Sequence, residues 1–147
     1  MGKRAQQHGF TLVELMVAVA IIAILSGIGY PMYLQQVQKA RRAEIPRMAM
    51  AVALAQEKMR GLATTNASFT TDLTLAALRL NSQAIQSDYY NIAIAAGAGG
   101  IATSFVITLT ATGAQLSDTD CRTMTINHLG VKTAVNSSGA DTTTACW

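Results

Sequence analysis

Glu14 is the residue whose position most directly implies chemistry. It lies inside a long apolar segment, where a carboxylate costs about 2.5 to 3.5 kcal/mol on membrane-insertion scales. No Lys, Arg or His occurs between Gly9 and Lys39, so no side chain nearby in the sequence neutralises it. Cleavage before Phe10 would create an α-amino group close enough to supply the missing charge. We expect this amine, from the same chain or a neighbour, to neutralise Glu14. Pairing with a neighbour would set the axial register of packed apolar helices.

Cys121 and Cys146 are the other residues with a possible covalent role, and both lie near the C-terminus. An even number of cysteines near the end of an exported domain predicts one disulfide, formed in an oxidising compartment. Their spacing does not match a CxxC redox or zinc motif. His128 alone does not complete a metal site, so we expect neither a metal nor a cofactor.

The remaining sequence contains no pattern typical of catalysis. Apart from its first nine residues, the chain has one His and five Asp, none of them in a recognisable catalytic motif. The glycine run at 97–100 and the segment 137–139 lack the strand-to-helix context of a phosphate-binding loop or a nucleophile elbow. The sequence therefore predicts a protein that is not an enzyme.

The N-terminus is typical of a leader followed by a membrane span. Residues 1–9 are polar and include Lys3 and Arg4, whereas residues 15–33 contain no charged side chain and nearly match the length of a membrane-spanning helix. An ordinary secretory signal has a shorter apolar core, so we expect this segment to be retained. The basic leader places the N-terminus in the cytoplasm and the rest of the chain outside the inner membrane. The alternative is an uncut signal anchor with Glu14 near the lipid headgroups.

Residues 9–14, with the sequence GFTLVE, resemble the prepilin processing motif of type IV pilins and of the related pseudopilins. The resemblance implies that a prepilin peptidase cuts between Gly9 and Phe10 and methylates the new Phe10 amine. It gives Glu14 the family's acidic position and Pro31 the family's helix-bending proline. The implied role is polymerisation into a fibre.

Beyond the apolar segment, the sequence predicts that the helix continues to about Arg60. Apolar residues recur at steps of three to five after residue 37, and Gly61 is a suitable end. Gly27, Gly29 and Pro31 weaken the helix, so we predict a bend or local melting there. Pro46 removes a second backbone donor. In the family, stems lose helix near the first of these positions when they pack in fibres.

The second half of the chain predicts a small antiparallel sheet. Strands are expected at 89–95, 104–111, 123–127 and, more weakly, 131–135, because apolar side chains alternate and short turn sequences separate the runs. Residues 61–88 read as a connection with one helical turn near 73–80. The predicted fold is α+β: the membrane-spanning first half of a long N-terminal helix precedes a distal half that packs on the sheet.

A Cys121–Cys146 disulfide would stabilise the final strands by about 3 to 4 kcal/mol in the chain-entropy model. In the resembled family, such a disulfide-bounded C-terminal loop forms the variable outer surface. The ending Cys146-Trp147 is similar to PilE-type minor pilins. For Trp147 we favour packing on the sheet edge over contact with a ligand.

The charge of the chain gives little support for nucleic-acid binding. The formal net charge is +3, but removal of Lys3 and Arg4 leaves 9 basic against 8 acidic residues. Arg79, Arg122 and Lys132 are the candidate DNA contacts in the head, and ordinary solvation explains them equally well. Lys39, Arg41, Arg42 and Arg47 are interpreted as residues that flank the membrane or form a solvated helix face.

The predicted organisation is a leader at 1–9, a transmembrane and filament-core helix at 10–34, and a globular head at 35–147. The resemblance implies a minor pilin that contributes to pilus biogenesis, twitching motility, adhesion or DNA uptake. Its partners would be other pilins, in a homo- or hetero-polymer, the prepilin peptidase and methyltransferase, and the inner-membrane assembly machinery. The subunit would begin as a single-pass inner-membrane precursor with a periplasmic head and end in an extracellular fibre. The alternatives are a DNA- or surface-binding tip pilin and a pseudopilin of a type II secretion system.

Overall fold

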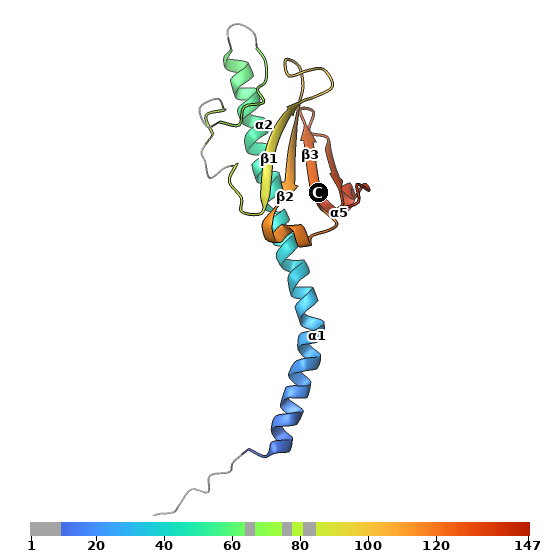
Figure 1. Cartoon of the computed structure of the whole chain (residues 1–147). Helices are drawn as coiled ribbons and strands as arrows, with labels where there is room; N and C mark the ends of the chain where they lie inside the picture. Colours follow the sequence, from blue (N-terminus) through green and yellow to red (C-terminus); the bar gives the residue numbers. More distant parts are fainter. Residues whose placement is uncertain (1–9, 64–66, 75–77, 81–84) are drawn as a thin grey trace, which may run out of the picture. The chain divides into compact units, whose positions relative to one another are not determined.

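The computed structural model describes residues 10–63, 67–74, 78–80 and 85–147. The chain divides into two compact units, Met1–Val37 and Gln38–Trp147, which are considered separately. Figure 1 labels their helices and strands. The predicted leader, including Gly9, lies outside the described residues.

Helix α1 (Leu12–Arg42) contains no buried residue. Apolar side chains surround its first part, and its most apolar window has a mean hydropathy of 2.5. By length and composition, the helix could cross a membrane. The helix is continuous through Gly27, Gly29 and Pro31. The bend at these positions therefore stays a prediction about the assembled fibre.

The long predicted helix is present, but it is interrupted by a turn at Ala43, which separates α1 from α2 (Glu44–Leu62). Pro46 explains the turn, because it has no N–H to donate to the carbonyl of Arg42 four residues earlier. At the turn itself, the Ala43 N–H is shared between the carbonyls of Lys39 and Ala40, at 3.3 and 3.2 Å. The sequence identified Pro46 as a weak point but did not predict the two-segment helix.

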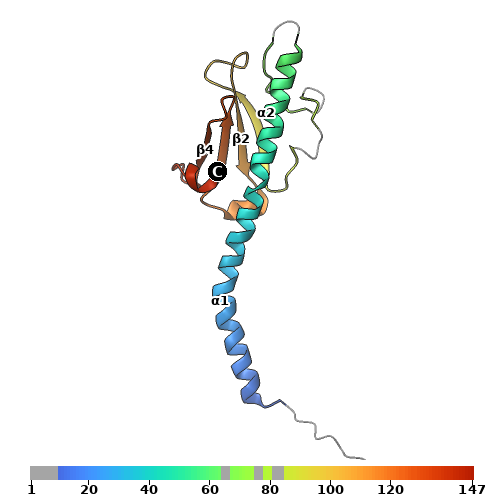
Figure 2. The same cartoon turned by 180° about the vertical axis from the view of Figure 1, so that it is seen from behind.

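One face of α2 is buried against the sheet. Its buried residues recur at helical spacing and are Ile45, Met48, Ala49, Val52, Ala55 and Gln56. The view from behind in Figure 2 shows α2 lying across one face of the strands. The predicted amphipathic stripe is thus present, and it includes a polar residue, Gln56.

Four antiparallel strands form the sheet in the order β1-β2-β3-β4. They are β1 (Tyr90–Ala96), β2 (Phe105–Ala111), β3 (Thr123–Asn127) and β4 (Lys132–Val135). Leu109 of β2 pairs with Ile92 of β1 and Met124 of β3, so these apolar side chains lie in one row of the inner face. All four predicted strands are confirmed, with ends that differ by at most one residue.

The connection between α2 and β1 is held to the core by specific contacts. The side-chain amide of Gln56 accepts from the Thr70 N–H at 2.9 Å and donates to the Thr70 carbonyl. The Phe69 ring packs edge-on against Phe105, with centroids 4.7 Å apart. The helical turn predicted at 73–80 falls partly on residues 75–77, outside the described residues; within the described part, the Leu78 N–H donates to the Thr74 carbonyl.

Candidate functional site

The start of α1 is capped by a reciprocal pair, Thr11 and Glu14. The Thr11 N–H and hydroxyl both donate to Glu14 Oε2, at 2.9 and 2.8 Å, and the Glu14 N–H approaches the Thr11 hydroxyl at 3.2 Å. This is a capping box, in which a Thr and a Glu three residues apart satisfy backbone groups at a helix N-terminus. Sequence analysis did not use the signature, although Thr-x-x-Glu stands in the sequence.

The capping box changes the interpretation of Glu14. One carboxylate oxygen is occupied by groups of its own chain, so the acid has partners even before any amine reaches it. Phe10 beside it is 91% exposed. The structure therefore holds the carboxylate at the start of the helix, close in sequence to the predicted new N-terminus.

The apolar side chains of α1 form a continuous uncovered surface within its unit. Each of them is more than 40% exposed, and the set is Leu12, Val13, Leu15, Met16, Val17, Val19, Ile21, Ile22, Ile24, Leu25, Ile28, Tyr30, Met32, Tyr33 and Leu34. A surface of this extent requires lipid or other apolar helices as its environment.

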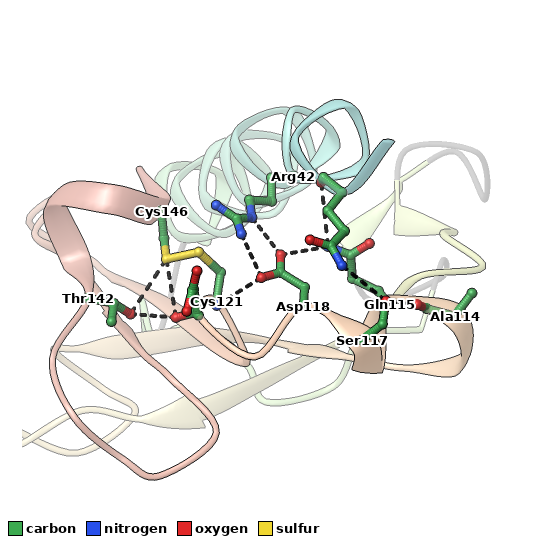
Figure 3. A network of polar contacts seen from close by, with 10 residues as sticks. Arg42, Ala114, Gln115, Ser117, Asp118, Cys121, Thr142 and Cys146 are labelled. Atoms are coloured by element: carbon green, nitrogen blue, oxygen red, sulfur yellow. Dashed lines mark hydrogen bonds and ion pairs between the residues drawn. A yellow bond between two sulfur atoms is a disulfide. The ribbon is translucent and has the colours of Figure 1, made fainter. Parts of the chain in front are cut away.

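In the second unit, a buried ion pair joins the end of α1 to the loop before β3. The Arg42 guanidinium donates twice to the Asp118 carboxylate, and the two side chains are 15% and 1% exposed. The hydrogen bonds to Asp118 raise the pKa of Arg42 above its usual value. Gln115 Nε2 and the Cys121 N–H also donate to Asp118, at 2.8 and 3.3 Å. Figure 3 shows how Asp118 lies at the centre of this network.

The same network places the short 3₁₀ helix η1 (Gly113–Ser117) beside α1. Gln38 Nε2 donates to the Ser117 hydroxyl at 3.1 Å, and Gln115 is buried. Tyr90 lies near this network, and its burial, followed by the charge of Asp118, raises the pKa of its hydroxyl to about 12. Because Cys121 belongs to the disulfide, this network ties the C-terminal loop to residues 38–42 of the helix.

The Cys121–Cys146 disulfide is present, with the two Cα atoms 5.7 Å apart, which confirms the predicted C-terminal loop. The segment it holds covers the outer edge of β4. The Thr142 N–H donates to the Ala134 carbonyl, and the Ala134 N–H donates to the Thr143 hydroxyl, both at 2.9 Å. Thr143 also donates to Asp141, which lowers the pKa of that carboxyl.

Trp147 lies against this edge too. Its indole N–H donates to the Thr133 carbonyl at 2.9 Å, and the Lys132 ammonium lies 4.9 Å from the ring centroid. The C-terminal segment thus satisfies backbone groups that an edge strand would otherwise expose.

The three candidate DNA contacts do not come together. Arg122 is half-buried, with one guanidinium nitrogen fully buried, and Lys132 lies on Trp147. Arg79 is exposed and lies on the wall of a groove together with Lys58 of α2, which the sequence analysis did not select. No group of three or more His, Cys, Asp or Glu side chains in the described segments is arranged to hold a metal ion.

Comparison with known proteins gives a family match over most of the chain. Residues 31–125 match the family described as "Type IV minor pilin ComP, DNA uptake sequence receptor". Residues 4–30 match the "Prokaryotic N-terminal methylation motif".

Two individual proteins are also similar. The "Prepilin peptidase-dependent protein D" of Escherichia coli (strain K12) is 60% identical over 35 residues, which are 24% of each chain, so the match spans about a quarter of that relative. A type IV pilin from Shewanella oneidensis has a solved structure that aligns with a TM-score of 0.47 and 21% identity, over 65% of this chain and 89% of that one.

The buried ion pair yields a stability prediction. Asp118→Asn keeps the side-chain shape but leaves Arg42 without its counter-charge, so we expect the free energy of unfolding to fall by about 3 kcal/mol or more. Urea unfolding of the full chain in detergent, followed by circular dichroism, measures it. Asp120→Asn is the matched control, since Asp120 is exposed. Equal unfolding midpoints for wild type and Asp118→Asn would contradict the assigned role.

Proposed function

Because this chain belongs to the family of type IV minor pilins described as ComP, DNA uptake sequence receptor, we propose that its stem polymerises into a pilus while its head binds DNA. The observation that carries the proposal is the match of residues 31–125, more than half of the chain, to that family. The family consists of structural pilins. We infer a role in assembly and binding, without catalysis.

Maturation begins at the N-terminus. A prepilin peptidase cuts between Gly9 and Phe10, and the Phe10 amine is methylated. The methylation motif at residues 4–30 supports this step, and so does the exposure of Phe10. Before cleavage, the basic leader keeps the N-terminus in the cytoplasm and the head in the periplasm.

Glu14 sets the register of assembly. Its Oε2 accepts both bonds from Thr11, whereas Oε1 has no hydrogen-bond partner among residues 10–63 or the other described segments. The Phe10 amine of a neighbouring subunit binds this second oxygen. Apolar helices otherwise slide past one another at little cost, so one charge pair per subunit selects a single stagger.

Assembly exchanges one apolar environment for another. The exposed side chains of α1 leave lipid and pack against the stems of neighbouring subunits, so extraction costs little hydrophobic free energy. Gly27, Gly29 and Pro31 let the stem bend or stretch as it packs. Head-to-tail contacts that do not close into a ring then give a filament. Inner-membrane assembly proteins supply the energy, and the product is an extracellular fibre.

A pseudopilin of a type II secretion system would share the processing motif. The family match and the C-terminal disulfide favour a pilin over that alternative.

For Glu14→Ala, we expect normal membrane insertion but few or no subunits in fibres, because the register pair is lost. Immunoblots of sheared fibres and of membranes measure the two pools. Thr11→Ala is the matched control: it removes the capping hydroxyl but keeps the carboxylate, so it should still enter fibres. Wild-type incorporation of Glu14→Ala would contradict the register role, and equal failure of both variants would assign the defect to capping.

For Gly9→Val, we expect uncleaved precursor, because a branched side chain at this position obstructs the peptidase. Intact mass measurement of the membrane-extracted protein should then include the leader and no added methyl group. Val13→Leu, four residues beyond the cut, should be trimmed normally. A trimmed Gly9→Val chain would place the cleavage site elsewhere.

The DNA-binding part of the proposal predicts that the wild-type full chain, in nanodiscs of phosphatidylcholine, retains a short fluorescent DNA duplex at low salt. Fluorescence anisotropy measures the binding, with empty nanodiscs as the control. If wild-type protein leaves the anisotropy of the duplex unchanged at low salt, the head does not bind DNA.

A further inference from the structure

DNA binding requires cationic side chains that reach phosphates, and each phosphate contact contributes through counterion release. The head contains nine such residues: Lys39, Arg41, Arg42, Arg47, Lys58, Arg60, Arg79, Arg122 and Lys132. These cations differ in how many carboxylates lie near them. If the proposed function holds, the cations that contact DNA are those that gather where carboxylates are few.

The end of the head nearest α1 carries no excess positive charge. Arg42 is neutralised by Asp118, and the Arg41 guanidinium lies over the Tyr89 ring, 4.2 Å from its centroid. Besides the Arg42–Asp118 pair, this end has three cations, Lys39, Arg41 and Arg47. Glu44 and Asp88 line a hollow together with Arg47, and the charge of Asp120 acts on Arg42. Three cations and three carboxylates balance, so this end does not attract a polyanion.

The sheet is unsuitable for a different reason. The strand positions opposite the core carry no charged side chain and include Thr108, Thr110, Thr123, Thr125 and Thr133. Arg122 has a buried guanidinium nitrogen, and Lys132 is a single cation at the β4 edge. Neither face nor edge of the sheet therefore gathers several cations.

The opposite end of the head, where α2 finishes, differs. Lys58 of α2 and Arg79 of the connecting segment line a groove of about 550 Å³, and no carboxylate is among its described lining residues. Leu54 and Leu62 on its wall are exposed. Arg79 is exposed and has a φ of 50°, in the left-handed region that Arg rarely adopts.

Arg60 stands at the same end. Its guanidinium lies over the Phe69 ring at 5.0 Å from the centroid, and the residue is exposed to solvent. Glu57 and Asp72 are the acidic residues there, so three cations exceed two carboxylates by one. The β4 edge has the same excess of one, with Arg122 and Lys132 against Asp141, but the α2 end gathers three cations and the edge only two.

The neighbouring β1–β2 loop permits a close approach. It contains Gly97, Gly99 and Gly100 and no charged side chain, and the Phe69 N–H donates to the Ile101 carbonyl at 3.1 Å. Both views show this loop and the end of α2 at the same end of the head. A duplex backbone can therefore approach Arg60 without meeting a charged side chain of the loop.

We propose that Lys58, Arg60 and Arg79, which we call the α2-end cations, contact the phosphates of bound DNA. Three phosphate contacts are few, so a single subunit binds weakly and with a shallow salt dependence. The logarithm of the binding constant should fall with the logarithm of salt concentration with a slope of about −2.7, that is about −0.9 for each contact.

The test measures this slope for the full chain in phosphatidylcholine nanodiscs, using a short fluorescent duplex. Lys58→Gln and Arg60→Gln should each reduce the slope by about 0.9, and so should Arg79→Asn, where Asn tolerates the positive φ. The triple variant should lose detectable binding. Lys132→Gln and Lys39→Gln are matched controls, and neither should alter the slope.

The outcomes separate this inference from the proposed function. If the wild type binds and the triple variant keeps its slope, the α2-end cations do not contact DNA, although the head does. If Lys132→Gln or Lys39→Gln reduces the slope instead, the contact surface lies at the β4 edge or near α1. If the wild type fails to bind, the DNA-binding function itself is wrong. Near-identical circular dichroism spectra confirm that each variant is folded.

Discussion

A helix that is apolar on every side must be covered by something other than water, and this constraint governs the whole molecule. None of the residues of α1 is buried within the chain. An apolar surface of this extent requires an apolar environment, such as lipid or other apolar helices. In such an environment every polar group of the helix needs a partner.

Glu14 is the charged side chain within the apolar part of α1. The capping box shows how a carboxylate is tolerated there: Thr11 satisfies one oxygen and the first turn of backbone at once. These contacts restrict the orientation of the Glu14 carboxylate at the start of the helix.

The head solves a different problem, that of joining a loop at the C-terminus to the end of α1. A disulfide, a buried ion pair and backbone bonds along β4 all converge on residues 118–147. The covered β4 edge limits pairing of this sheet with the edge strand of another chain. The charges of the head balance near the end of α1 and are absent from the outward sheet positions. They leave an excess of one at the β4 edge and of one at the end of α2, where three cations gather.

Patterns carried by near neighbours in the chain were predictable from the sequence alone. The membrane span, the stripe of α2 and all four strands depend on side chains spaced two to four residues apart, and the capping box was equally legible at Thr11 and Glu14. The turn at Ala43 was predicted only in part. Pro46 indicates that the helix is weak in this region, but a proline does not fix the residue at which the helix is interrupted. Arg42 and Asp118 stand 76 residues apart, and Lys58 and Arg79 meet only across a groove. Only the tertiary structure decided these pairs. The packing of the sheet on the helix determines which side chains that are distant in sequence lie close together.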